Sequence, residues 1–290
     1  MSAASHEDPE FATAVGIVGV GLIGGSIAAA LKQRRFPGRV IGLGRDNSRL
    51  EGAHSAGLID AIAAAPRALV EIADLVVVCT PVDRIPADVR ALAAHARPGT
   101  LLTDAGSSKR EICRELSSGL PDGVTFIGSH PLAGSEKQGF EHAVGGLFQN
   151  RVCVVTPDDA TPPAAFARLR RFWEYLGSEV VVMSAEEHDL ALAQTSHVPH
   201  LASVAIALTL ADANRRYAAG GFRDATRIAA GDPDLWAAIL LSNADEVAAG
   251  VRAFEERMTE LRAAVERQDA AALKKLLQLA KTKRDALDVK

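Results

Sequence analysis

The sequence predicts an α/β fold, in which a doubly wound parallel sheet forms an N-terminal domain (residues 11–183) and an all-helical domain (residues 184–290) follows. Between residues 14 and 183, short apolar runs alternate with helix-like stretches. The runs are continuously apolar, which is typical of parallel strands buried on both faces. After residue 184 the strand signal disappears, and Ala, Leu and charged residues recur with helical spacing.

The elements of the first domain follow one another as strand and helix. The predicted strands are the runs AVGIVGV, RVIGLG, LVVVC, TLLTD, VTFIG, RVCVV and EVVVM. Helix-like stretches at 23–33, 47–56, 85–96 and 109–116 separate the first five of them, and we expect all seven strands in one parallel series. In the second domain we expect helices over 185–211, over 234–249 and from 247 onward.

Composition and charge narrow the classes of protein. Apolar residues make up 48% of the 290 residues and charged residues 23%, an ordinary globular mixture. The net charge is −4 and Lys and Arg are scattered, so we expect no nucleic-acid partner. Cys79, Cys113 and Cys153 lack Cys-x-x-Cys spacing and indicate reduced thiols, hence the cytoplasm. The start of the chain has no signal-peptide pattern and no run of about 18 apolar residues follows, so we expect no membrane association.

A glycine-rich turn follows the first strand directly and opens a helix. In that context, backbone N–H groups and the N-terminus of the helix can hold the pyrophosphate of a dinucleotide, as in Rossmann domains. The alternative is a tight strand-to-helix turn without a ligand. We assign cofactor contacts to Gly19, Gly21, Leu22, Ile23 and Gly24.

The end of the second strand bears on which dinucleotide binds. An Asp or Glu about 20 residues beyond the glycine motif usually receives the ribose hydroxyls of NAD. Here Gly44 holds that place and Arg45 follows it. A guanidinium suits a 2′-phosphate, so we favour NADP over NAD and assign Arg45 to the cofactor. Asp46 would serve the ribose if the strand end is shifted.

Polar residues also follow the later strands. Thr80 and Pro81 come after LVVVC, and Asp104 and Ser107 come after or within the stretch TDAGSSK. Ligands of such folds bind at the carboxyl ends of the strands, so we assign Thr80, Pro81 and Asp104 to the cofactor. His130 ends the next strand and is expected at the same edge.

The stretch TSHVPH places two histidines on an otherwise apolar helix. His197 and His200 lie one turn apart, and Pro199 frees a carbonyl near Thr195, which predicts a kinked helix carrying a site. The alternative for His200 is a hydrogen-bonded core residue. Together with His188 the two histidines lack a ligand pattern such as His-Glu-x-x-His, so no metal is expected.

Five motifs together carry a family resemblance. GIVGVGLIGGS, TDAGSSK, GSHPLAGSEKQG, TSHVPH and GGFRDATRIAAGDPDLW, in this order over nearly the whole chain, resemble the prephenate and arogenate dehydrogenases of tyrosine biosynthesis. The resemblance implies NAD(P)-dependent oxidative decarboxylation of a cyclohexadienol. Prephenate would give 4-hydroxyphenylpyruvate and arogenate would give tyrosine; we place prephenate first on family grounds.

The resemblance also implies roles for individual residues. His130 would be the base that accepts the proton of the substrate hydroxyl, since a neutral imidazole suits that step. Ser107 would be hydrogen-bonded to His130 and orient it. His197 would position the substrate, and Arg227 would hold a substrate carboxylate with its guanidinium fork.

Four further residues match positions around the substrate in the family. Glu136 matches a gating acidic residue, and Arg223 is its candidate partner. Trp236 and Gly220 match residues that lie across the subunit boundary at the active site, which implies a functional homodimer. The alternative for Trp236 is core packing, and Glu136, Arg223 and Arg227 would otherwise be surface charges.

An apolar seam bears on the homodimer. Its residues are spaced four, three, four, three, four: Val247, Val251, Phe254, Met258, Leu261 and Val265. Such a seam packs either inside the helical domain or against a second copy of the chain.

Two rival functions stay open. One is another dehydrogenase with a sheet domain and a helical domain, such as a β-hydroxyacid dehydrogenase, which would carry a lysine where this chain has TSHVPH. The other is a nucleotide sensor that has lost the chemistry. The presence of Ser107, His130, His197 and Arg227 favours the enzyme.

Overall fold

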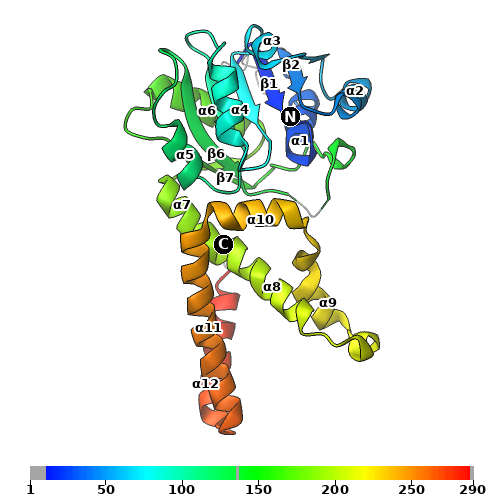
Figure 1. Ribbon diagram of the computed structural model, residues 1–290, viewed down its shortest axis with the longest axis vertical. Coiled ribbons are helices and arrows are strands. Elements are labelled where there is room, and N and C mark those ends of the chain that lie inside the picture. Colours follow the sequence, from blue (N-terminus) through cyan, green and yellow to red (C-terminus); the bar gives the residue numbers. More distant parts are fainter. Residues whose placement is uncertain (1–10, 135–136, 288–290) are drawn as a thin grey trace, which may run out of the picture.

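A computed structural model of the chain describes residues 11–134 and 137–287. Within these residues eight strands form one sheet, with helices on both sides and a helical part below it (Figure 1). The strand order is β3-β2-β1-β4-β5-β6-β7-β8. The strands are β1 (Ala14–Val18), β2 (Arg39–Leu43), β3 (Ala61–Ile62), β4 (Leu75–Val78), β5 (Leu101–Asp104), β6 (Thr125–Pro131), β7 (Val152–Thr156) and β8 (Glu179–Val182). The two-residue edge strand β3 is one that the sequence reading did not predict.

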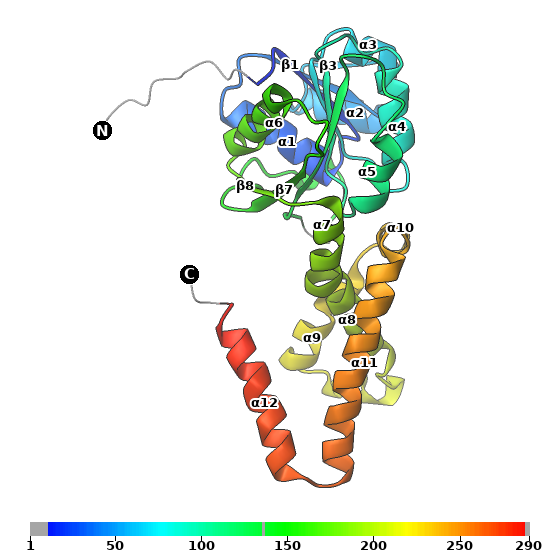
Figure 2. The same ribbon diagram turned by 90° about the vertical axis from the view of Figure 1, so that its left-hand side faces the viewer.

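The sheet is doubly wound, as predicted. Its helices are α1 (Leu22–Gln33), α2 (Asn47–Ser55), α3 (Pro66–Val70), α4 (Ile85–Ala93), α5 (Arg110–Leu116) and α6 (Pro163–Tyr175). Val15 and Ile17 pack with α1 and α6, whereas Ala14 and Val18 pack with α3 and α4. Figure 2 shows α1 and α6 on one side of the sheet and α3 and α4 on the other. The central strands β1 (AVGIV) and β4 (LVVV) therefore carry no polar side chain, because each face meets its own layer of helices.

One expectation about the sheet is wrong. The strands from β3 to β6 are parallel, but β7 pairs antiparallel to β6, with Pro131 opposite Cys153. Residues 132–151 contain no crossover helix among those described, only the short 3-10 turn Phe140–His142. Without a helix to carry it back over the sheet, the chain stays at the carboxyl edge and re-enters in the opposite direction. That return keeps residues 133–134 and 137–139 beside a cavity at this edge.

The helical part begins with a distorted helix. The predicted helix 185–211 is α7 (Ala185–Leu192), a π-helical segment (Ala193–His197) and α8 (Val198–Leu208). Pro199 lacks the N–H that an α-helix would direct to Thr195, so the irregular turn lies where the sequence predicts a kink. It carries His197 into the interior, where that side chain is 1% exposed.

The remaining helices are α9 (Gly220–Thr226), α10 (Pro233–Ser242), α11 (Ala244–Glu266) and α12 (Ala270–Asp285). The predicted helix 234–249 is broken at Asn243, whose φ of −126° and ψ of 35° leave the helical region. As a result α10 lies beneath the sheet domain, and α11 runs away from it (Figure 1). Among the described residues no helix has the length and apolar character needed to span a membrane.

Helices α11 and α12 form a long hairpin that projects from the rest of the chain (Figure 2). Val247, at the base of α11, is 7% exposed. Further along the seam, Phe254, Met258 and Val265 are 37%, 49% and 60% exposed. Packing within the chain therefore accounts for the start of the seam but not for its outer part.

Candidate active site

The glycine turn between β1 and α1 is built by contacts that exclude a side chain. Gly19 has φ +88°, and a Cβ there would lie 3.0 Å from the carbonyl oxygen of Cys79. A Cβ at Gly24 would lie 2.3 Å from the carbonyl oxygen of Gly19. Gly19 and Gly24 thus shape the turn, and only glycine fits both places.

Gly21 has a different role in the same turn. It is the N-cap of α1, and no side chain caps the helix there. A Cβ at Gly21 would meet no protein atom within 4 Å, and Gly21, Leu22 and Ile23 line a cavity. Uncapped backbone N–H groups and the helix dipole beside an open space fit the pyrophosphate of a dinucleotide.

This cavity has a volume of about 1050 Å³ and lies between the sheet edge and the helical part. Its walls come from the ends of β1, β2, β4, β5 and β6, from the loop after β6, from the π-helical segment before α8, from the residues between α9 and α10, and from α10. The predicted site residues that line it are Gly21, Leu22, Ile23, Arg45, Thr80, Pro81, Ser107, His130, His197, Arg227 and Trp236. The fold thus brings together residues 215 positions apart in the chain, from Gly21 to Trp236.

The end of β2 presents two cations to the cavity. Arg45 and Arg49 both line it, and both are exposed. Asp46 instead caps α2, because its carboxylate accepts a hydrogen bond of 3.1 Å from the N–H of Arg49. The same carboxylate lies 3.3 Å from the Arg49 side chain. The structure therefore gives Asp46 a helix-capping role and leaves guanidinium groups at this end of the cavity.

Asp104 is not placed as expected. Its side chain is fully buried, forms an ion pair with the equally buried Lys109, and does not line the cavity. Its carboxylate also accepts hydrogen bonds from the N–H groups of Gly106, at 2.8 Å, and Ser129, at 3.0 Å. Asp104 thus holds the ends of β5 and β6 together beneath the site rather than facing a cofactor.

Two further residues of the expected site, Gly220 and Arg223, do not line the cavity of this chain, and Gly220 was expected to contribute across the subunit boundary. Both are exposed on α9. The Arg223 guanidinium donates to the carbonyl oxygen of Ala218 at 3.3 Å. Glu136 falls outside the described residues.

His130 ends β6 and its ring is 8% exposed. We expected Ser107 to hydrogen-bond it, but in the described part of the chain Nδ1 of His130 pairs with Nε2 of His188 at 2.8 Å, and Ser107 makes no side-chain hydrogen bond. The expectation about the partner of His130 is therefore wrong. Burial, reinforced by the His188 and Lys109 side chains, lowers the pKa of His130 well below its usual value.

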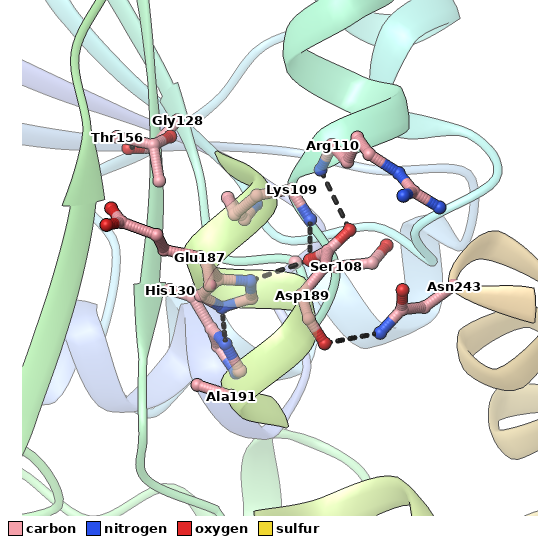
Figure 3. A network of polar contacts seen from close by, with 12 residues as sticks. Ser108, Lys109, Arg110, Gly128, His130, Thr156, Glu187, Asp189, Ala191 and Asn243 are labelled. Carbon is pink, nitrogen blue, oxygen red and sulfur yellow. Dashed lines mark hydrogen bonds and ion pairs between the residues drawn. The ribbon is translucent and has the colours of Figure 1, made fainter. Parts of the chain in front are cut away.

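His188, the partner of His130, forms a hydrogen bond with Asp189 through its other ring nitrogen. Nδ1 of His188 lies 2.7 Å from Oδ1 of Asp189, and both side chains are fully buried (Figure 3). Sequence reasoning considered His188 only as a metal ligand and missed Asp189. Two adjacent polar residues within a short helix carry no signal that they face inward. Their burial depends on how α7 docks on the sheet edge.

His197 reaches the cavity from the π-helical segment. Burial lowers its pKa to about 4, so the ring is neutral near pH 7. The Asn243 amide nitrogen lies 3.3 Å from Nδ1 of His197, and since an amide nitrogen only donates, Nδ1 accepts and Nε2 carries the hydrogen. Nε2 is buried and has no hydrogen-bond partner among the described residues, so its N–H can donate to a bound group such as a substrate oxygen.

Trp236 closes the same end of the cavity. Its ring stacks on His200 with centroids 3.5 Å apart and planes at 9°, and it meets His197 edge-on. Trp236 thus lines the cavity of its own chain, and His200 supports it from behind. Within the described residues no group of three or more His, Cys, Asp or Glu side chains is arranged to hold a metal ion.

A doubly wound sheet, a glycine turn open to a large cavity and a buried neutral histidine at the neighbouring strand end define a dinucleotide-dependent dehydrogenase. Comparison with known proteins gives the family. Residues 27–182 match the model of the prephenate dehydrogenase nucleotide-binding domain, and residues 184–279 match that of its dimerization domain. The chain belongs to the prephenate dehydrogenase family.

Individual relatives agree with this assignment. The chain is 34% identical to a prephenate dehydrogenase of Bacillus subtilis over 94% of its own length and 76% of the relative's. It is 35% identical to a cyclohexadienyl dehydrogenase of Zymomonas mobilis over 88% and 89% of the two chains. The crystal structure of prephenate dehydrogenase from Aquifex aeolicus with hydroxyphenyl propionate and NAD+ superposes with a TM-score of 0.89 at 30% identity, covering 95% and 98%.

Proposed function

We propose that this protein catalyses the oxidative decarboxylation of prephenate to 4-hydroxyphenylpyruvate, with arogenate as the alternative substrate. The observation that carries the proposal is that one cavity is lined by the glycine turn, by His130 at the end of β6, and by His197 and Arg227 of the helical part. Relatives named prephenate and cyclohexadienyl dehydrogenases support the same substrate class.

The residues of the cavity divide the reaction among themselves. A nicotinamide dinucleotide held at Gly21, Leu22 and Ile23 would supply the hydride acceptor. His130, neutral because burial lowers its pKa, accepts the proton of the substrate hydroxyl. The guanidinium of Arg227 pairs with a substrate carboxylate, and Nε2 of His197 donates to a second substrate oxygen. Loss of CO2 leaves its bonding electrons in the ring, which becomes aromatic, and the phenol oxygen regains the proton from His130.

Four assays test this function: absorbance of the reduced nicotinamide with prephenate or arogenate and with NAD or NADP. We expect turnover with prephenate, and silence in all four combinations from folded protein would contradict the proposal. In His130→Asn, turnover should fall by roughly two to four orders of magnitude, the usual contribution of a general base, while nucleotide affinity stays unchanged. An unchanged turnover would remove His130 from the mechanism.

NADP is the preferred cofactor in this proposal. Arg45 and Arg49 line the cavity at the end of β2, and Asp46 is engaged as the cap of α2. A 2′-phosphate would meet two guanidinium groups there and no free carboxylate. Removing Arg45 by Arg45→Ala should raise the KM for NADP roughly 10- to 100-fold, the value of a charge-assisted hydrogen bond, and leave that for NAD nearly unchanged. Arg67→Ala, an exposed arginine away from the cavity, is the matched control.

We also infer that the enzyme is a cytoplasmic homodimer. The exposed apolar side chains along α11 and the match of residues 184–279 to a dimerization domain support the homodimer. Cys79, Cys113 and Cys153 are all free thiols, as a reducing compartment requires. Light scattering of the purified protein tests the dimer, and a monomeric mass at micromolar concentration would contradict it.

A further inference from the structure

Behind the catalytic base lies a line of buried polar groups that leads away from the cavity. Nδ1 of His130 is 2.8 Å from Nε2 of His188, and Nδ1 of His188 is 2.7 Å from Oδ1 of Asp189 (Figure 3). His188 and Asp189 do not line the cavity, so neither touches substrate or cofactor. We call these three residues the relay.

The hydrogens in the relay have one consistent arrangement. Burial alone would raise the pKa of Asp189, but hydrogen bonds from the His188 side chain and the N–H groups of Arg110 and Lys109 lower it, so the carboxylate is ionised and only accepts. Nδ1 of His188 therefore donates to Asp189. Burial lowers the pKa of His188 as well, so the ring is neutral and its Nε2 accepts.

The same logic fixes the base. Since Nε2 of His188 accepts, Nδ1 of His130 must donate to it. His130 is neutral, so its other ring nitrogen, Nε2, carries the lone pair. Nε2 is the nitrogen left for the cavity that His130 lines. The relay thus selects the tautomer in which His130 can accept a proton from substrate.

Asp189 is held by several contacts that come from different parts of the fold. The N–H groups of Lys109, at 2.7 Å, and Arg110, at 2.9 Å, donate to its two carboxylate oxygens at the start of α5. Its backbone carbonyl accepts from the amide of Asn243 at 2.8 Å, between α10 and α11. The orientation of the relay is therefore set where the helical part docks on the sheet edge.

We propose that His188 and Asp189 are positioning residues of the dehydrogenase, which hold His130 in its Nδ1–H tautomer and stabilise the imidazolium that forms during the reaction. The proposal rests on the function proposed above. When the substrate O–H bond breaks and the Nε2–H bond of His130 forms, the new positive charge is shared through Nδ1–H with His188. The negative charge of the Asp189 carboxylate, on the far side of the His188 ring, then stabilises that positive charge.

The tautomer can be measured without turnover. In the protein labelled with 15N-histidine and free of ligands, two-dimensional 1H–15N spectra distinguish a ring nitrogen that carries hydrogen from one that does not. We expect His130 with hydrogen on Nδ1 and a lone pair on Nε2, assigned by loss of its signals in His130→Asn. The opposite tautomer in the unmodified protein would overturn the proposal.

Two variants test the relay in catalysis. His188→Phe keeps a ring beside His130 but removes the acceptor, so His130 should populate both tautomers and kcat should fall roughly 10- to 1,000-fold, with KM and nucleotide affinity unchanged. In Asp189→Asn the amide oxygen can still accept from Nδ1–H of His188 and from the N–H of Lys109, but the negative charge is lost, so kcat should fall while His130 keeps its Nδ1–H tautomer. Cys153→Ala, a fully buried change on the neighbouring strand β7, should alter neither the spectrum nor kcat.

The outcomes separate this proposal from the proposed function. The relay would be refuted if His188→Phe had the kcat of the unmodified protein and its spectrum showed that His130 keeps the Nδ1–H tautomer. Absence of turnover by the unmodified protein with every substrate and cofactor combination would refute the function, while the spectra would still decide the tautomer. Where His188→Phe does not fold, Asp189→Asn and the spectrum of the unmodified protein decide the question.

Discussion

Replacing each of two glycines of the same turn by alanine should have different effects: at Gly24 it should lower stability, and at Gly21 it should weaken nucleotide binding. At Gly24 the added Cβ would lie 2.3 Å from the carbonyl oxygen of Gly19 and 2.8 Å from Cγ2 of Ile17. Both distances are below any normal contact, and the first involves backbone that cannot rotate away. Gly24→Ala should therefore lower the free energy of unfolding by about 1–3 kcal/mol, the usual cost of overpacking. For a domain of this size, the melting temperature falls by roughly 2–4 °C per kcal/mol.

At Gly21 the added Cβ meets no protein atom within 4 Å and projects into the space beside the uncapped start of α1. Gly21→Ala should lower the free energy of unfolding by no more than about 1 kcal/mol, the amount by which an N-cap prefers glycine to alanine. It should weaken nucleotide binding at least about tenfold, equivalent to about 1.4 kcal/mol, because the methyl group occupies the place of the pyrophosphate.

Thermal unfolding and a calorimetric titration with nucleotide measure both effects on the two variants. The contrast between them is the test, because each variant controls for the other. The reasoning would be refuted if Gly21→Ala bound nucleotide as tightly as the unmodified protein, or if Gly24→Ala were equally stable. In the first case the turn would not be the pyrophosphate site.

Three further predictions follow from the same structure. His197 has a pKa of about 4 in the folded protein against 6.5 in the unfolded chain, so the unfolded state binds the proton first as the pH falls. Urea titrations should therefore show up to about 3 kcal/mol of stability lost between pH 6.5 and 4, and a smaller loss in His197→Gln. A flat profile, or an equal loss in His197→Gln, would contradict this. Asp46→Ala should cost about 1 kcal/mol in urea titrations as a lost cap of α2, yet leave the KM for NAD unchanged; a large rise would mean that Asp46 binds the ribose after all. Met258→Lys should convert dimer to monomer in light scattering with little change in the helical signal of circular dichroism, and an intact dimer would place the interface elsewhere.

Much of the sheet domain was predictable because its signals are local. Continuous apolar runs separated by helix-like stretches predict parallel strands buried on both faces, and the doubly wound sheet confirms that prediction. The direction of β7 was not predictable in the same way. An apolar run such as RVCVV looks the same in either direction, and only the missing crossover helix makes it antiparallel.

The site shows the same division between local and tertiary information. The glycine turn, His130 and His197 stand out because each residue type breaks the pattern of its element. Asp104 misled sequence reasoning, because a strand-end carboxylate has the same sequence signature whether it faces a ligand or a buried lysine. Asp189 escaped it, because a charged residue near a helix start is usually solvated.

The sequence by itself determined the two-part architecture, the family and the residue types that the chemistry needs, because apolar periodicity and motif spacing are properties of the chain alone. The tertiary structure alone decided which groups meet: His188 rather than Ser107 behind His130, and Asn243 behind His197. These pairings join residues 46 or more positions apart, as in the 58 between His130 and His188. The first hydrogen bond exists only after α7 docks on the sheet edge, and the second only after the helices of the second domain pack together, because each pair must be brought together and shielded from water.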